Sequence, residues 1–186
     1  MRFLITAGHG ANDPGNTWHG VTESALMTEL RFIVAMKLRE DGHHVTEDGG
    51  RGHNQPLVEA IKMVSGHDVA IELHTNASTN NAAEGVEVVA ARKDRVLAQQ
   101  LAGAIGGVLQ TPTRRDSGWF PVDQLARERG FTPGFVRAGG IIVETFFQSN
   151  PGELATYQER RWLVASAIAR VLHAHAQEKA RAATVQ

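Results

Sequence analysis

The chain opens with a short apolar run, Arg2-Phe-Leu-Ile-Thr-Ala7, which ends in Gly8-His9-Gly10. A short apolar segment that glycine interrupts is typical of a buried strand. A turn-rich loop, Ala11-Asn-Asp-Pro-Gly-Asn16, follows, and Glu23 then begins the first strongly periodic helix. These first 23 residues therefore predict a strand, a loop and a helix, with a histidine just after the strand and a carboxylate in the first turn of the helix.

Apolar periodicity continues this alternation of strands and helices along the chain. It predicts strands at residues 2–7, 43–47, 68–74, 85–91 and 141–146, and helices at 22–41, 56–66, 93–110 and from 150 until fraying near 179. The segment 111–140 mixes proline, glycine and charges, and predicts only a short helix at 122–129. Because most strands are apolar on both faces, we expect an α/β fold: a single three-layer sandwich domain with a mostly parallel, mixed β-sheet flanked by helices.

Length and composition limit the possible functions. A chain of 186 residues suits one domain, which we expect at residues 1–176, with 177–186 as a frayed C-terminal tail. The formal net charge of −1 provides no field that would attract nucleic acid. The absence of cysteine excludes disulfides, thiolate metal sites and cysteine nucleophiles.

The N-terminus does not predict a signal peptide, because the apolar run after Arg2 is short and no small-residue cleavage site follows it. The sequence also lacks the run of about 18 apolar residues that a transmembrane helix requires. We therefore expect a soluble monomer that is synthesised in the cytoplasm.

Four residues that can bind a metal ion or carry a proton fall at strand ends or at a helix start. His9 follows the first strand, and Glu23 lies in the first turn of the next helix. His74 ends the strand 68–74, and Glu144 lies near the end of the strand 141–146. In an open α/β sheet these positions share one edge, where ligands bind. The sequence therefore predicts that the four side chains converge.

Three of these residues also have a purely structural explanation. His9 could tolerate an unusual backbone conformation, the helix macrodipole favours Glu23, and His74 could cap a strand end. Glu144 is harder to explain in this way, because it interrupts an apolar run, Ile141-Ile-Val-Glu-Thr-Phe-Phe147. A buried carboxylate is costly unless it is paired or functional. The residues by themselves leave both explanations open.

The order of the motifs resembles that of a known family. The motifs are Gly8-His9-Gly10-x-x-Asp13-Pro14-Gly15, Glu23 at a helix start, Leu73-His74-Thr75-Asn76-Ala77, Gly85-Val-Glu87, and Ile142-Val143-Glu144-Thr-Phe-Phe-Gln-Ser149-Asn150. This succession resembles the zinc-dependent N-acetylmuramoyl-L-alanine amidases with a His-Glu-His metal site, which include bacterial autolysins and phage endolysins. The resemblance extends from about Phe3 to about Val171, nearly the whole chain.

The resemblance implies that His9, Glu23 and His74 bind one zinc ion and leave a fourth position for water. It implies that Glu144 is the catalytic general base and then the general acid. The bond cleaved would be the amide between N-acetylmuramic acid and L-alanine of the peptidoglycan stem peptide. Asn76 and Arg137 are further candidates for binding the substrate.

The chain departs from the family pattern in two places. Glu72 stands where the family usually has a small polar residue. It shares a strand face with His74, so we expect it to orient His74 by a hydrogen bond rather than to act as an extra acid. The segment 111–139, which contains Arg137, differs most from the family.

Two other functions fit the same residues. A cytoplasmic zinc amidohydrolase of a small acylated amino acid would need no long open cleft for a glycan strand. A catalytically silent peptidoglycan-binding domain would more readily have lost one of the four site residues. Without a predicted signal peptide or wall-binding module, we expect a bacteriolytic phage or prophage endolysin rather than a secreted autolysin, acting on cell-wall or periplasmic peptidoglycan.

Overall fold

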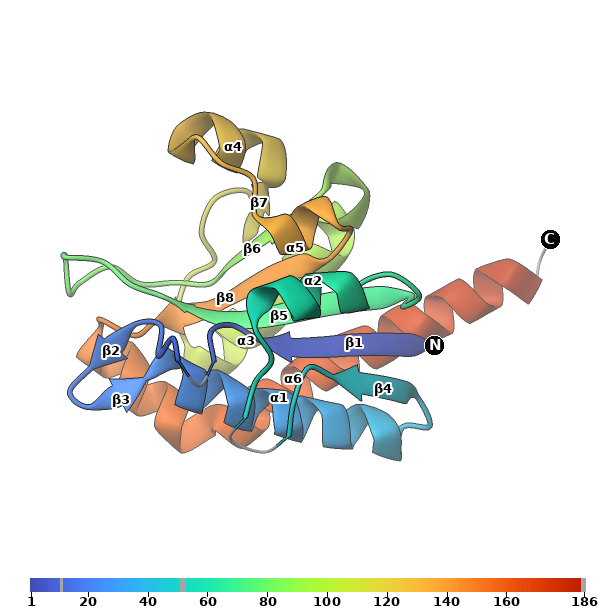
Figure 1. The fold of residues 1–186 in the computed structure, drawn as a ribbon, viewed down its shortest axis with the longest axis horizontal. Coiled ribbons are helices and arrows are strands. Elements are labelled where there is room, and N and C mark those ends of the chain that lie inside the picture. The colour runs from blue at the N-terminus through green and yellow to red at the C-terminus, as the bar shows by residue number, and fades with distance from the viewer. Residues whose placement is uncertain (11, 51–52, 185–186) are drawn as a thin grey trace.

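The structure is a computed structural model that describes residues 1–10, 12–50 and 53–184. Its six-stranded sheet has the order β4-β1-β5-β8-β6-β7 (Figure 1). The strands are β1 Arg2–Ala7, β4 His44–Glu47, β5 Val69–Asn76, β6 Glu87–Ala90, β7 Trp119–Pro121 and β8 Ile141–Phe147. The strands β1, β4, β5 and β8 are mutually parallel, whereas β6 is antiparallel to β8 and parallel to β7. The mixed, mostly parallel sheet that the sequence predicts is thus confirmed.

Helices cover both faces of the sheet. One face packs against the long helices α1 (Glu23–Glu40), α3 (Arg95–Leu109) and α6 (Pro151–Thr184). The other face packs against the short helices α2 (Leu57–Met63), α4 (Val122–Arg129) and α5 (Gly134–Arg137) (Figure 1). A 3₁₀ turn, η1 (Arg92–Asp94), precedes α3, and a small hairpin of β2 (Thr17–Trp18) and β3 (Val21–Thr22) precedes α1. Among the helices of the described ranges, none combines the length and the apolar character that crossing a bilayer requires.

Strand alternation explains why the sheet has two cores. In β1, Phe3 and Ile5 are buried against the long helices, and Leu4 is buried against the short ones. In β5, the face toward the short helices changes from apolar Ala70 to polar Glu72 and His74 as the strand approaches its carboxyl end. This face of the sheet is therefore polar at the carboxyl end of β5.

Helix α1 begins where local sequence chemistry predicts. The side chain of Thr22 caps the helix and accepts a hydrogen bond from the backbone N–H of Ala25, at 3.3 Å. Glu23 lies in the first turn, and Lys37 and Arg39 lie in the last, which suits the helix macrodipole. The cap therefore places Glu23 at the start of the helix, directly after the hairpin of β2 and β3.

The sequence-based assignment differs from the structure in several places. The hairpin of β2 and β3 forms at residues 17–22, where no strand was expected. Strand β7 and helix α5 lie in the segment 111–140, where only the helix 122–129 was expected. Strand β5 continues through Asn76 rather than ending at His74. The final helix remains helical to Thr184, so the expected fraying near Lys179 is wrong. The strong helix formers in Gln177-Glu-Lys-Ala-Arg-Ala-Ala183 explain this extension. Residues 185–186 lie outside the described residues, and the domain boundary at 176 stays a prediction.

A buried arginine joins helix α1 to the loop after β4. Arg31 is completely buried, and its guanidinium donates to Asp48 Oδ1 and to Asn54 Oδ1, each at 2.6 Å. Asp48 accepts a hydrogen bond from the backbone N–H of Ala7 at 3.3 Å, and Asn54 Nδ2 donates to the carbonyls of Ala7 and His9. Arg31 thereby holds the two side chains that fasten the end of β1, where His9 lies.

Replacing Arg31 by methionine is expected to lower the free energy of unfolding by about 3–5 kcal/mol. The substitution leaves the Asp48 carboxylate buried without its cation, which is the costly way to break a buried ion pair. Chemical denaturation followed by circular dichroism measures the loss. Arg170→Met, at an exposed position of α6, is the matched control and is expected to change stability by no more than about 0.5 kcal/mol. Equal effects of the two substitutions would contradict this role of Arg31.

Candidate metal centre

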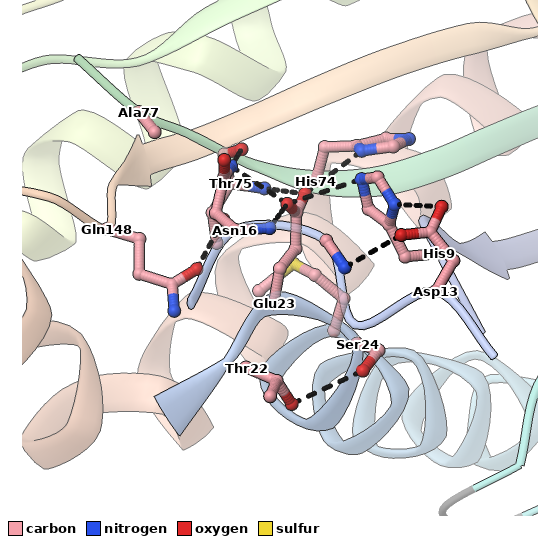
Figure 2. Close-up of polar contacts among 12 residues, drawn as sticks. His9, Asp13, Asn16, Thr22, Glu23, Ser24, His74, Thr75, Ala77 and Gln148 are labelled. Carbon is pink, nitrogen blue, oxygen red and sulfur yellow. Dashed lines mark hydrogen bonds and ion pairs between the residues drawn. The ribbon is translucent and has the colours of Figure 1, made fainter. Parts of the chain in front are cut away.

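The fold brings His9, Glu23 and His74 together from the end of β1, the start of α1 and the end of β5 (Figure 2). One ligand atom from each residue lies within 4.8 Å of the others. His9 Nε2 lies 3.3 Å from Glu23 Oε2, and His74 Nδ1 lies 3.0 Å from Glu23 Oε1. The two imidazole rings meet edge to face, with their centroids 5.3 Å apart. The convergence that strand-end positions predict for these three residues is therefore observed.

Glu23 is buried and held in one orientation. The backbone N–H of Thr75 donates to Oε1 at 2.8 Å, and Asn16 donates to Oε2 from its backbone and its side chain at 3.0 and 2.9 Å (Figure 2). Burial by itself raises the pKa of Glu23, but the hydrogen bond and charge of His74, together with these N–H donors, hold that pKa below its ordinary value. Glu23 is therefore an oriented carboxylate between two histidines.

His9 adopts a left-handed backbone conformation, with a φ of 64°. Its Nδ1 lies 2.9 Å from Asp13 Oδ2, and this hydrogen bond holds the pKa of Asp13 below its usual value. A carboxylate on one ring nitrogen fixes the orientation of the imidazole and leaves the other nitrogen free to act as a ligand. The Asp13 contact therefore directs His9 Nε2 toward Glu23.

His74 lies between two carboxylates. Its Nδ1 faces Glu23, and its Nε2 lies 3.1 Å from Glu72 Oε1, as the shared strand face of Glu72 and His74 predicts. Burial by itself lowers the pKa of His74, but the hydrogen bonds to Glu23 and Glu72 and the charge of Glu144 raise it well above the ordinary value. This part of the site therefore strongly favours a positive charge.

Glu144 lies beside His74, because the parallel register of β5 and β8 pairs these two residues. Its Oε2 is buried and has no hydrogen-bond partner among residues 1–10, 12–50 and 53–184. Burial raises the pKa of Glu144 to about 7; Glu23 and Glu87 add to this shift, while His74 and Arg129 oppose it. A carboxyl group with a pKa near neutrality and an unpaired oxygen can accept and return a proton.

The donor set suits a divalent metal ion. Two imidazoles and one carboxylate are typical ligands of catalytic zinc, and ligands at tetrahedral positions around zinc stand about 3.4 Å apart. One ligand atom from each of the three residues lies within 4.8 Å of the others, which is close enough for a single ion to contact all three. Glu72 and Glu144 add negative charge next to His74, which a cation would balance.

The two candidates for substrate binding occupy different surroundings. Asn76 lies at the end of β5 and donates to Glu87 Oε1 at 3.2 Å. Arg137 lies exposed at the end of α5, and its side chain forms no hydrogen bond or ion pair within the part of the chain that the structure describes. The fold therefore brings Asn76, but not Arg137, into contact with a residue that borders Glu144.

Three residues that shape this site, Asp13, Asn16 and Glu87, were not among the predicted site residues. Asp13 and Asn16 orient His9 and Glu23, and their position in a turn four and seven residues from a ligand candidate was the available signal. Glu87 was noted only as part of a motif. As a carboxylate within the apolar run 85–91, it offered the same signal as Glu144.

A mixed α/β sheet with two histidines at strand ends and a glutamate at a helix start, beside a carboxyl group whose Oε2 has no hydrogen-bond partner among the described residues, defines a domain suited to metal-assisted hydrolysis. Residues 3–174 match the N-acetylmuramoyl-L-alanine amidase family. The chain belongs to this family.

Solved structures and a curated relative agree with this membership. A Neisseria meningitidis protein assigned as an N-acetylmuramoyl-L-alanine amidase is 35% identical, with a TM-score of 0.86 over 95% of this chain and 96% of that one. An N-acetylmuramoyl-L-alanine amidase from Clostridium difficile 630 shares the fold at 22% identity, with a TM-score of 0.79 over 96% and 97% of the two chains. A Staphylococcus aureus protein assigned as a probable autolysin PH is 25% identical in a 108-residue alignment that covers 49% of this chain. The chain matches 22% of that curated relative's length.

Proposed function

We propose that this chain hydrolyses peptidoglycan at the amide bond between N-acetylmuramic acid and L-alanine of the stem peptide, with one zinc ion as its cofactor. The observation that carries the proposal is the group of His9, Glu23 and His74 with Glu144 aligned beside it. Membership of the amidase family supplies the substrate class.

His9, Glu23 and His74 would hold the zinc ion. When bound, zinc polarises the scissile carbonyl and lowers the pKa of water. Asp13 and Asn16 keep His9 and Glu23 oriented before any ion arrives, so little reorganisation accompanies binding. The Glu72 carboxylate orients His74 in the same way.

Glu144 would move the proton. Glu144 is paired with His74 in the register of β5 and β8, and its Oε2 has no hydrogen-bond partner among the described residues, so this oxygen can accept a proton from the attacking water. The same oxygen then returns the proton to the nitrogen of L-alanine, which leaves as a free amine. This return makes the departure of the peptide possible, because an amide nitrogen leaves poorly without a proton.

Replacing Gly8 by alanine is expected to weaken zinc binding by about 10- to 100-fold, the usual effect of disturbing a residue that orients a ligand. A Cβ atom at position 8 would lie 2.1 Å from Cε1 of His74, so the ring must leave its place between Glu23 and Glu72. Competition with a fluorescent zinc chelator measures the affinity.

Gly103→Ala is the matched control, because nothing lies within 4 Å of a Cβ at that helical position. It is expected to keep the zinc affinity of the original chain. Unchanged affinity in the Gly8→Ala variant would contradict the role of His74 as a ligand.

The experiment that tests the proposed function identifies the products. Purified protein is incubated with peptidoglycan sacculi, then with 1,10-phenanthroline, and then with added zinc. We expect stem peptides with a new N-terminal alanine, no new reducing sugar ends, loss of activity with the chelator, and recovery with zinc. New reducing ends would instead indicate a glycosidase. Hydrolysis of N-acetyl-L-alanine without release from sacculi would favour a small-molecule amidohydrolase.

The phage or prophage endolysin role, the place of action and the monomeric state remain predictions from the sequence. Lysis of a host from within, when the chain is produced together with a holin, tests the endolysin role. Light scattering of the purified protein tests the monomeric state.

A further inference from the structure

Three arginines surround one buried carboxylate next to the candidate metal centre. We call Glu87, Arg114, Arg115 and Arg129 the Glu87 cluster. Glu87 has only 2% of its surface exposed, and its carboxylate lies 3.2, 3.6 and 4.0 Å from nitrogens of Arg114, Arg115 and Arg129, respectively. The three arginines come from the segment 111–139, which differs most from the family pattern.

The sheet places this cluster directly beside Glu144. The antiparallel register of β6 and β8 pairs Glu87 with Glu144, and the parallel register of β8 and β5 pairs Glu144 with His74. Side chains at paired positions project from the same face of a sheet. His74, Glu144 and Glu87 therefore form a row, with the metal group at one end and the arginines at the other. Asn76 strengthens this connection by donating to Glu87 Oε1 at 3.2 Å.

The arginines are held in place and remain accessible. The guanidinium of Arg114 lies over the ring of Phe147 at 4.9 Å, and that of Arg115 lies over Phe120 at 4.1 Å. The side chains of Arg114, Arg115 and Arg129 are nevertheless 36%, 30% and 49% exposed. Side chains that are ordered before binding lose little entropy when a ligand arrives.

The cluster has more positive than negative charge. Among the described residues, Glu87 and Glu128 are the carboxylates with which these three arginines form ion pairs. Three guanidinium groups against two carboxylates leave an excess of one positive charge. The carboxylate of Glu87 already accepts hydrogen bonds from Asn76 and Arg114. The exposed N–H groups of the arginines can therefore donate hydrogen bonds to a second anion.

We propose that the Glu87 cluster binds a carboxylate of the stem peptide on the leaving-amine side of the scissile bond, and so favours peptides with a free carboxylate next to L-alanine. This inference rests on the proposed function. The substrate's negative charge lies in the peptide, because the lactyl carboxyl group of N-acetylmuramic acid is bound in the amide. The glycan side of the substrate offers no carboxylate for the arginines.

Two synthetic muropeptides that differ in one group test this inference. N-acetylmuramoyl-L-alanyl-γ-D-glutamyl-L-lysinamide has a free α-carboxylate on the residue after L-alanine, and N-acetylmuramoyl-L-alanyl-D-isoglutaminyl-L-lysinamide has the neutral amide there. In both substrates the γ-carboxyl group is bound in the peptide. We expect the zinc-loaded protein to cleave the carboxylate substrate with a kcat/KM about tenfold higher, because a charge-assisted hydrogen bond is about twice as strong as a neutral one. The difference is expected mainly in KM.

Variants of the arginines separate recognition from a structural role. Arg114→Gln and Arg129→Gln are expected to bring the ratio of the two kcat/KM values close to one, and Arg114→Lys to retain part of the preference. Of the three arginines, Arg129 makes the longest contact with Glu87. Its replacement is therefore expected to affect the stability of the fold least. The matched control is Arg92→Gln, whose side chain is 72% exposed and pairs with Asp123. It is expected to keep the tenfold ratio.

The outcomes distinguish this inference from the proposed function. If the protein cleaves both substrates equally well, or if the arginine variants keep the tenfold ratio, the carboxylate site is wrong and the amidase function stands. If the protein cleaves neither these substrates nor sacculi, the proposed function fails and this inference fails with it.

Discussion

Glu144→Gln is expected to lower kcat on peptidoglycan by about a thousandfold. Glutamine keeps the size of the side chain but cannot take a proton from water, and general acid–base catalysis contributes about 10²–10⁴ to enzymatic rates. The side chain lies beside His74 in the sheet and has an unpaired buried oxygen, so the loss should fall on proton transfer rather than on folding. Initial rates of stem-peptide release measure kcat.

Two controls test whether the loss of kcat comes from proton transfer rather than from loss of the metal or of the fold. Metal analysis of Glu144→Gln is expected to show one zinc ion per chain, because His9, Glu23 and His74 are intact. Glu159→Gln, at an exposed position of α6, is expected to have the original kcat. A rate within tenfold of the original would exclude Glu144 as the proton carrier. Loss of the metal as well would assign Glu144 a role as a ligand.

His74→Ala is expected to abolish zinc binding and to reduce activity to the background rate. Removing one of the three proposed ligands leaves Glu23 and His9, and it also takes away the partner that holds the pKa of Glu23 below its ordinary value. In the original chain, zinc at about 1,000 times its dissociation constant should stabilise the fold by about 4 kcal/mol. The variant is expected to show no such stabilisation.

Thermal unfolding with and without zinc measures this difference. His44→Ala, at an exposed position of β4, is the matched control and is expected to keep the shift of the unfolding temperature with zinc. A zinc-dependent shift of the same size in His74→Ala would show that the metal binds elsewhere. Restored zinc binding in His74→Cys would support a ligand role, because a thiolate is also a zinc ligand.

Local chemistry made most of the fold predictable. The apolar run of β1 ends at glycine, and α1 has an apolar stripe, a threonine cap at Thr22 and basic residues in its last turn. These signals act within a few residues of each other, so a single sequence contains them. Strand β7 and helix α5 lack such signals, because β7 has three residues and α5 has four. Pairing with β6 and the hydrogen bond from Trp119 Nε1 to the carbonyl of Ala90 hold β7 in place.

The candidate site also has a part that the sequence predicts and a part that only the tertiary structure shows. The sequence by itself determined that His9, Glu23, His74 and Glu144 belong to one edge of the sheet, because strand ends and helix starts in an α/β fold meet there. It could not determine which nitrogens face Glu23, nor that Asp13 orients His9 and Asn16 orients Glu23. Only the tertiary structure decided that Glu87 stands beside Glu144 and that three arginines surround it. Apolar periodicity is a property of neighbouring residues, so the sequence contains it directly. The ion pairs of Glu87 depend on strand register and on arginines 27 to 42 positions away, which reach Glu87 only in the folded molecule.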